Sequence, residues 1–272
     1  PPIPGNNLVL TIDKDLQQAA EDALVAGIQR AHQDKFTKAA GGAVVALDPR
    51  NGQVLAMASY PDYDPSLWVG KMDSAKYAEL TAPEAHNPLF NRAIKGLYPA
   101  GSTFKAFVAA AALNAGVVTP DTVFSCNGRY TAAQQIWKCW KTEGHGDLNL
   151  IAALEESCDV YFYNLGNLLY QQTGPVLQDG VRQFGFGQAT GVDLPGEYKG
   201  RVPDKEWKRL NGKTEIDKLW KTGDEINLAI GQGDLLVTPL QLAVGLAAVA
   251  NGGDVWVPHL GLQITDASGN VI

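Results

Sequence analysis

The sequence lacks three features that would assign it to common classes of protein. No block of lysine and arginine occurs in its 272 residues, and acidic residues outnumber basic ones by 29 to 22. Phosphate backbones are bound through clustered basic side chains, so nucleic acid is excluded as the main partner. No stretch reaches the run of about 18 apolar residues that a spanning helix needs. The start, residues 1–4, has neither the basic residues nor the apolar run of a signal peptide, so a soluble chain is expected. Glycine (29 residues) and proline (15 residues) are too few for a disordered sequence, so the chain is expected to be compact.

Apolar residues make up 45% of the chain, which is enough for one large domain or two small ones with a buried core. Two strand-like runs within 41–58 are separated by a turn containing Asn51-Gly52, which predicts a hairpin. The region 60–88 is expected to be a loop with short helical pieces. Helices are expected from a cap at Asp13, at 104–115, at 149–166 and from Thr238 to Gly252, and further strands at 7–12, 256–258 and 260–264. This order predicts an α+β fold.

Only one of the seven serines, Ser102, is followed three residues later by a lysine, Lys105. Because about one such pair is expected by chance in a chain of this length, the neighbouring residues decide its meaning. A turn at 99–101 precedes the expected helix, which places the serine near the helix N-terminus and the lysine on the same face. The helix dipole and the apolar neighbours disfavour an ammonium there. A neutral lysine can take the hydroxyl proton of the serine, which predicts a nucleophile with its base.

A second candidate element lies further along the chain, where Ser157 and Asp159 form a Ser-x-Asp arrangement. Such a tripeptide has little specificity alone. Beside Ser102 and Lys105 it supplies a second hydroxyl, which acyl transfer needs to pass a proton to the leaving group.

The combination resembles the penicillin-recognising serine enzymes, whose signature is Ser-x-x-Lys followed by a Ser-x-Asn-like element. Longer motifs are similar to those of class B penicillin-binding proteins and occur in the same order: LTID at 10–13, ALDP at 46–49, NRA at 91–93, YPAGS at 98–102, GQG at 231–233 and TPLQLA at 238–243. Asp159 in place of asparagine, with the GHG stretch at 144–146, is most similar to the elongation type, penicillin-binding protein 2.

The resemblance implies a peptidoglycan D,D-transpeptidase that acts in cell-wall elongation. Ser102 is then expected to attack the penultimate D-alanine of a stem peptide, release the terminal D-alanine and pass the acyl group to an amine of a second stem peptide. Lys105 is implied as the acylation base, Ser157 as the relay to the leaving amine and Asp159 as the group that orients Lys105 or Ser157. One oxyanion donor is expected from the backbone N–H of Ser102 and a second from a strand. β-Lactams are expected to acylate the same serine, and no cofactor is needed for the reaction.

The resemblance also implies the fold of the penicillin-binding transpeptidases and serine β-lactamases, in which helices flank an antiparallel sheet and form a further subdomain. We expect 1–95 to hold a connecting strand, a helix and the first hairpin, 96–230 a mainly helical subdomain, and 231–272 a helix and a return to the sheet. A membrane anchor and a non-catalytic pedestal are expected outside this chain. The expected location is therefore the extracytoplasmic face of the cell membrane, and the expected partner is a SEDS-family glycosyltransferase of the rod-shape complex.

Two other functions stay open at this point. A class D-like β-lactamase also favours the sequence Ser-Thr-Phe-Lys found at 102–105, although the cell-wall motifs argue against it. A penicilloyl sensor or a non-catalytic cell-wall scaffold would bind or be acylated without cross-linking.

The family's third motif, Lys-Thr-Gly on a strand, has one match, Lys221-Thr222-Gly223. In the family this motif follows the GQG and TPLQLA motifs, whereas here it precedes them and runs into a polar stretch. We therefore interpret 221–223 as a loop and expect the true motif after Ile272.

All three cysteines lie within 33 residues, and one histidine, His145, lies among them. Cys126, Cys139, His145 and Cys158 would suffice for a tetrahedral structural zinc site. The alternatives are a disulfide between Cys126 and Cys139 with Cys158 buried as a small apolar residue, or three unrelated thiols. The use of every cysteine around a single histidine favours zinc, and the resemblance to the elongation type also implies a metal.

A zinc ion bound in this way would hold residues 127–146 onto the helix start that carries Ser157 and Asp159, because Cys158 lies between them. Two tryptophans flank the second cysteine and are interpreted as packing residues: Trp137 and Trp140.

Overall fold

The structure is a computed structural model that describes residues 5–70 and 73–272, so the N-terminal tetrapeptide and residues 71–72 of the expected loop lie outside it. The chain divides into two compact units. Unit 1 comprises Pro1–Leu97, Ala189–Tyr198 and Thr238–Ile272, and unit 2 comprises Tyr98–Gln188 and Lys199–Val237. Within the described residues, every helix is too short or too polar to span a bilayer.

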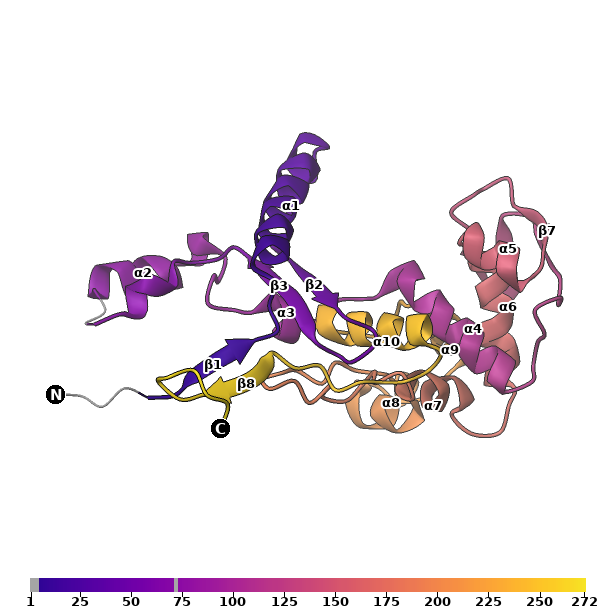
Figure 1. The fold of residues 1–272 in the computed structure, drawn as a ribbon. Coiled ribbons are helices and arrows are strands. Elements are labelled where there is room, and N and C mark those ends of the chain that lie inside the picture. The colour runs from indigo at the N-terminus through magenta and orange to yellow at the C-terminus, as the bar shows by residue number, and fades with distance from the viewer. Residues whose placement is uncertain (1–4, 71–72) are drawn as a thin grey trace. The chain divides into compact units, whose positions relative to one another are not determined.

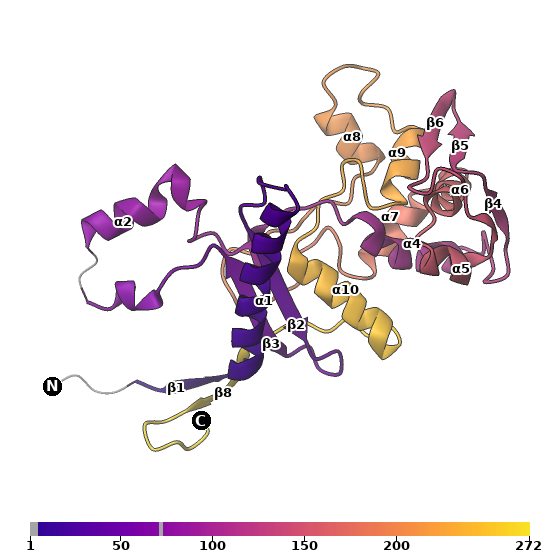
Figure 2. The ribbon, with the colours of Figure 1, turned by 90° about the horizontal axis from the view of Figure 1, so that it is seen from above.

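Unit 1 is built around the hairpin that the Asn51-Gly52 turn predicts, and the pairing of Val45 with Met57 confirms it. Asp13 caps the following helix as expected, since its carboxylate accepts the N–H groups of Asp15 and Leu16. The elements of unit 1, the longer of which are labelled in Figures 1 and 2, are β1 (Asn7–Leu10), α1 (Lys14–Gln33), β2 (Gly42–Leu47), β3 (Val54–Tyr60), η1 (Pro65–Trp68), α2 (Ser74–Thr81), η2 (Pro83–Ala85), α3 (Arg92–Lys95), α10 (Pro239–Asn251) and β8 (Gly261–Thr265).

Side chains of the hairpin alternate between two apolar clusters, as the two-residue period of a strand requires. One set packs with α1: Val44, Ala46, Ala56 and Ala58, against Ala20 and Leu24. The other set packs with α3 and α10: Ala43, Val45, Leu47 and Met57, against Ala93, Ile94, Leu240 and Val244. The strand expected at 256–258 is wrong, because that segment is irregular and the chain first pairs at His259, in an isolated bridge with Gln53.

Unit 2 contains helices in the two places where they were expected, although two helices stand where one was expected over 149–166. It also contains two short antiparallel sheets that the sequence did not reveal. The sheets pair β4 with β7 and β5 with β6. The elements of unit 2 are η3 (Gly101–Phe104), α4 (Lys105–Asn114), β4 (Phe124–Cys126), β5 (Arg129–Ala132), β6 (Gln135–Lys138), β7 (Gly146–Leu148), α5 (Leu150–Glu155), α6 (Asp159–Tyr170), α7 (Val176–Arg182), α8 (Lys205–Asn211) and α9 (Thr222–Leu228).

Helix α4 lies in the core of unit 2 and is apolar on most sides, which is typical of a buried helix. Phe107 on α4 contacts Phe186 at a centroid distance of 4.7 Å, and Phe104 contacts Phe186 at 5.1 Å. All three rings are fully buried. This aromatic cluster fixes the position of the turn that precedes α4, which carries the candidate nucleophile.

Candidate active site and cysteine cluster

Ser102 and Lys105 lie on one 3₁₀ turn that leads directly into α4. The N–H of Lys105 donates to the carbonyl of Ser102, an i to i+3 hydrogen bond that brings the two side chains onto the same face. Ser102 is exposed, whereas Lys105 is 1% exposed. The turn therefore presents a hydroxyl to solvent above a buried amine.

The amine of Lys105 makes three polar contacts with the Ser-x-Asp element. Nζ lies 2.6 Å from Oδ1 of Asp159, 2.8 Å from the carbonyl oxygen of Ser157 and 3.2 Å from Oγ of Ser157. Three acceptors around one amine suit an ammonium group. The carboxylate of Asp159, 54 residues away, forms an ion pair with this amine. The role of Lys105 as an uncharged base stays a prediction.

Ser157 interrupts the helix that was expected to run unbroken over 149–166. Its φ is +50°, in the left-handed region that a residue with a side chain rarely adopts. Helix α5 ends at Glu155 and α6 begins at Asp159, so the expectation of one helix was wrong. The break turns the Ser157 carbonyl and hydroxyl toward Lys105. Strain of this kind is common at functional sites.

Gly231, from the GQG motif, packs against the backbone of the turn that carries Ser102. Its carbonyl accepts the N–H of Gly101 at 2.9 Å. A Cβ on Gly231 would lie 2.2 Å from the carbonyl oxygen of Gly101 and 2.7 Å from its nitrogen, and the φ of Gly231 is +70°. Only glycine allows this approach of two backbones. The motif was recognised in the sequence, but its contact with the serine turn was not anticipated.

Gly231→Ala is expected to reduce the rate of acylation at Ser102 by about 10²-fold, because displacing Gly101 displaces the nucleophile. The matched control is Gly233→Ala: its φ is a similar +73°, but its Cβ would meet only the Asn227 side chain, at 3.2 Å. Acylation kinetics of both variants are measured by intact mass. They separate the effect of a Cβ that collides with the Gly101 backbone from the effect of a side chain at a positive φ. Equal losses in the two variants would contradict this interpretation.

The Lys221-Thr222-Gly223 match does not form a strand, and its interpretation as a loop was also wrong. Lys221 is the N-cap of α9, and Thr222 and Gly223 form the first turn of that helix. Asp224 closes the turn, since its Oδ2 accepts the N–H of Lys221 at 2.8 Å. Acidic residues in the first turn stabilise a helix by interacting with the positive end of its dipole. A helix that begins in this way starts with a polar stretch, which is easily taken for a loop.

Lys221→Ala is therefore expected to leave acylation by penicillin within about twofold of wild type, since an exposed helix cap contributes modestly to stability and nothing to the reaction. Stopped-flow or time-resolved mass measurements on the full-length protein test this. Loss of acylation would identify 221–223 as the third motif after all.

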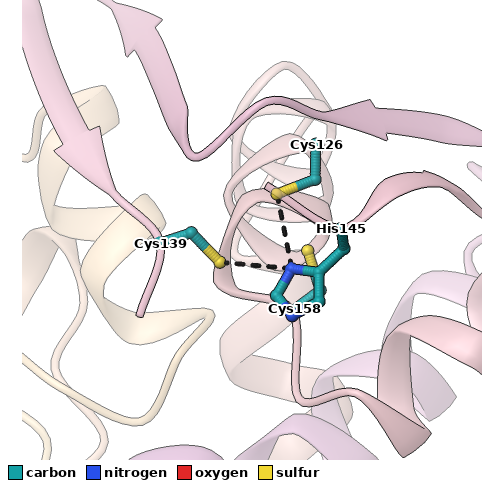
Figure 3. A group of neighbouring side chains, drawn as sticks. All are labelled: Cys126, Cys139, His145 and Cys158. Carbon is teal, nitrogen blue, oxygen red and sulfur yellow. Dashed lines mark hydrogen bonds between the residues drawn. The ribbon is translucent and has the colours of Figure 1, made fainter. Parts of the chain in front are cut away.

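The four residues of the cysteine cluster converge from distant parts of unit 2, as Figure 3 shows. Cys126 ends β4, Cys139 follows β6, His145 precedes β7, and Cys158 caps α6. Their ligand atoms all lie within 4.8 Å of one another, and the three cysteines are free thiols. The Cys126–Cys139 disulfide considered from the sequence is thus not formed.

The geometry of His145 fits a shared metal centre. Nδ1 lies 3.5 Å from Sγ of Cys126 and 3.6 Å from Sγ of Cys139, and ordinary Zn–N and Zn–S bonds in a tetrahedron separate nitrogen and sulfur by about 3.6 Å. Nδ1 can donate only one hydrogen, so a hydrogen bond explains its short distance to one of the two sulfurs and not to both. The distances therefore fit a metal site with three cysteine ligands and one histidine ligand.

The thiols differ in acidity. Burial raises the pKa of Cys126, but the N–H groups of Gly128 and His145 and the neighbouring thiols outweigh it and bring the pKa below its ordinary value. Burial raises the pKa of Cys158 to about 12. The N–H donors around Cys126 are of the kind that stabilise a thiolate.

Trp140 is more than the packing residue that the sequence suggested. The residue is 62% exposed, and it makes hydrogen bonds to Ser157 and Asp159 of the Ser-x-Asp element and to Glu156 just before it. Trp137, in contrast, lies beside the rings of Tyr130 and Tyr163, as expected of a packing residue. Nothing in the local sequence distinguishes the two tryptophans.

Residues 42–271 match the family described as penicillin binding protein transpeptidase domain. Peptidoglycan D,D-transpeptidase MrdA of Acinetobacter baumannii is 40% identical over 261 residues, which cover 95% of this chain and 36% of that protein. The crystal structure of Pseudomonas aeruginosa PBP2 in complex with WCK 5153 is 39% identical, with a TM-score of 0.83 over 99% of this chain and 58% of that one.

A further similar structure belongs to a study of the coordination of polymerization and crosslinking by a peptidoglycan synthase complex. It is 35% identical, with a TM-score of 0.84, and the match covers 97% of this chain and 45% of that one. The chain thus spans well under two thirds of these proteins. The α+β fold agrees with the two solved structures. The chain belongs to the penicillin-binding protein transpeptidase domain family.

Proposed function

We propose that the full-length protein is a peptidoglycan D,D-transpeptidase of cell-wall elongation, with Ser102 as its nucleophile. The observation that carries the proposal is the buried amine of Lys105, which contacts both Oγ of Ser157 and Oδ1 of Asp159. Family membership and the named relatives support the same reaction.

In the proposed reaction Ser102 Oγ attacks the carbonyl carbon of the penultimate D-alanine, and its proton passes to Lys105. For Nζ to accept that proton it must first release one, and Asp159, at 2.6 Å, is placed to receive it. Ser157 Oγ, at 3.2 Å from Nζ, gives its proton to the departing amine of D-alanine and is reprotonated by Lys105. An amine of a second stem peptide then attacks the ester and restores the Ser102 hydroxyl.

The tetrahedral oxyanion needs donors fixed in advance. The N–H of Ser102 belongs to the first turn of a helical segment, where N–H groups lack an intrahelical acceptor, so it can act as one donor. Gly231 supports this turn through Gly101 and keeps the donor in place.

Substrates of the proposed enzyme are stem peptides ending in D-alanyl-D-alanine, and β-lactams acylate the same serine because they mimic that end. The proposed location is the extracytoplasmic face of the cell membrane. The proposed partner is a SEDS-family glycosyltransferase, an assignment supported by the similarity to a protein from a complex that couples polymerization and crosslinking.

We also propose that Cys126, Cys139, His145 and Cys158 hold one structural zinc ion. All four positions of a tetrahedron would be filled by protein, so the ion supplies rigidity and leaves no position for a reacting water. Because Cys158 directly follows Ser157 and precedes Asp159, the cluster restrains the element that contacts Lys105.

Treatment of the full-length protein with penicillin tests the proposed function. A covalent adduct of the mass of one penicillin is expected, mapped by peptide analysis to the segment carrying Ser102, and stable over hours. With a stem-peptide donor and an added acceptor amine, the protein is expected to release D-alanine and to form a cross-linked dimer. Rapid hydrolysis of the adduct would favour the β-lactamase alternative. A stable adduct without cross-linking would favour a penicilloyl sensor, and the absence of any adduct would favour a non-catalytic scaffold.

A further inference from the structure

Trp140 makes three hydrogen bonds to the segment 156–159, each about 3.2 Å long. Its single indole N–H is shared between the carbonyl oxygens of Glu156 and Ser157, each 3.2 Å from Nε1. Its backbone N–H donates to Oδ2 of Asp159, also at 3.2 Å. One exposed residue therefore contacts the whole break between helices α5 and α6.

The carbonyls at this break need a donor from elsewhere in the chain. The last carbonyls of a helix lack intrahelical partners, and the left-handed backbone of Ser157 ends the regular pattern. The Ser157 carbonyl accepts from two donors, Lys105 Nζ at 2.8 Å and the Trp140 indole at 3.2 Å. Trp140 and Lys105 thus hold the same oxygen from two sides.

Asp159 is held in a similar way. Its Oδ1 faces Lys105, while its Oδ2 accepts the backbone N–H of Trp140. Both oxygens of the carboxylate are therefore fixed, one by the buried amine and one by Trp140. The indole ring also contacts the ring of His145 in a T-shaped arrangement, at a centroid distance of 5.2 Å. Trp140 therefore contacts both the cysteine cluster and the Ser-x-Asp element.

We propose that Trp140 is a positioning residue for acylation: its indole N–H holds the Ser157 carbonyl in the orientation that keeps Lys105 aligned with the Ser-x-Asp element. This inference rests on the proposed function of Ser102 and Lys105 and adds a residue to it. The indole does not act through burial, since the residue is 62% exposed. It acts through hydrogen bonds to a strained backbone.

Trp140→Phe removes the indole donor and keeps an aromatic ring. Trp137→Phe is the matched control, because it lies three residues earlier and also loses one indole hydrogen bond, to Asn227 Oδ1 at 3.3 Å, away from the Ser-x-Asp element. In the full-length protein we expect Trp140→Phe to lower the first-order acylation rate constant for penicillin by about tenfold. The dissociation constant of the initial complex and the zinc content should stay unchanged, and Trp137→Phe should leave the rate constant within about twofold.

The division between rate and binding separates positioning from contact with the ligand. A rise in the dissociation constant without a fall in the rate constant would overturn the proposal, because it would make Trp140 part of the binding surface. An equal fall in Trp137→Phe would also overturn it, since both variants would then act through general loosening of the loop.

Hydrogen exchange gives a test that does not depend on catalysis. The amides of Ser157 and Cys158 donate to the carbonyls of Leu154 and Ala153, and we expect them to exchange about tenfold faster in Trp140→Phe than in Trp137→Phe. If wild type forms no adduct, the proposed function fails and this exchange difference alone decides the role of Trp140. Unchanged exchange in Trp140→Phe would then overturn it.

Discussion

Replacing Lys105 by methionine will slow acylation of Ser102 by penicillin by about 10³-fold, the effect expected when a general base is removed. Methionine keeps the length of the side chain and most of its volume, so the surrounding core is preserved. The side chain of Lys105 is 2% exposed and that of Asp159 16% exposed, so water replaces little of the lost contact. Intact-mass time courses in the full-length protein give the rate.

The same substitution leaves the Asp159 carboxylate without its cation. Removing one partner of a buried ion pair costs about 3 kcal/mol, which corresponds to a fall in melting temperature of about 6–12 °C for a domain of this size. Loss of acylation and loss of stability are therefore expected together in Lys105→Met.

A double variant separates the two effects. Lys105→Met combined with Asp159→Asn removes both charges and is expected to regain most of the melting temperature without regaining acylation. Ser102→Ala provides the baseline with no adduct. If the double variant acylated within about tenfold of wild type, Lys105 would not be the base.

Removing zinc is expected to produce the second large effect. Purified full-length protein should contain one zinc ion per chain, and a strong chelator should lower the melting temperature by at least about 10 °C, since structural zinc contributes directly to folding free energy. Acylation should fall as well, because Cys158 joins the cluster to Ser157 and Asp159. Elemental analysis and calorimetry measure the two quantities.

Cys158→Ser should reproduce the effect of the chelator and abolish stoichiometric zinc. His259→Gln is the control, because His259 lies outside the cluster, with Nδ1 at 3.4 Å from the carbonyl of Val257. A protein that contains no zinc and is indifferent to chelator would show that the four side chains form only a hydrogen-bonded cluster.

The parts of the fold that the sequence predicted are those set by local chemistry. Asn51-Gly52 produces the hairpin turn, Asp13 caps α1, and α10 begins after Thr238 and ends at the left-handed Gly252. The break at Ser157 could not be predicted, since no glycine or proline marks it. Its strain is accommodated by hydrogen bonds from residues distant in sequence, and no local pattern contains these.

The candidate site shows the same division. The spacing, the preceding turn and the expected helix were together enough to pair Ser102 with Lys105. The clustering of three cysteines within 33 residues was enough to group them with His145. The resemblance was needed to connect Asp159 with this pair, because 54 residues separate it from Lys105. The contribution of Gly231 depends on how closely its backbone approaches that of Gly101, and the contribution of Trp140 depends on the orientation of the Ser157 carbonyl. Neither can be inferred from residue types.

The division of the chain between the two units has a consequence for biosynthesis. Unit 2 is made of two segments and unit 1 of three, so the polypeptide passes between them four times. The core that holds the β2–β3 hairpin needs Leu240 and Val244 from α10, which leave the ribosome almost 200 residues after the strands. Until α10 is made, α3 covers only part of this apolar face of the hairpin. Such long-range contacts leave apolar surface exposed during folding, which favours aggregation.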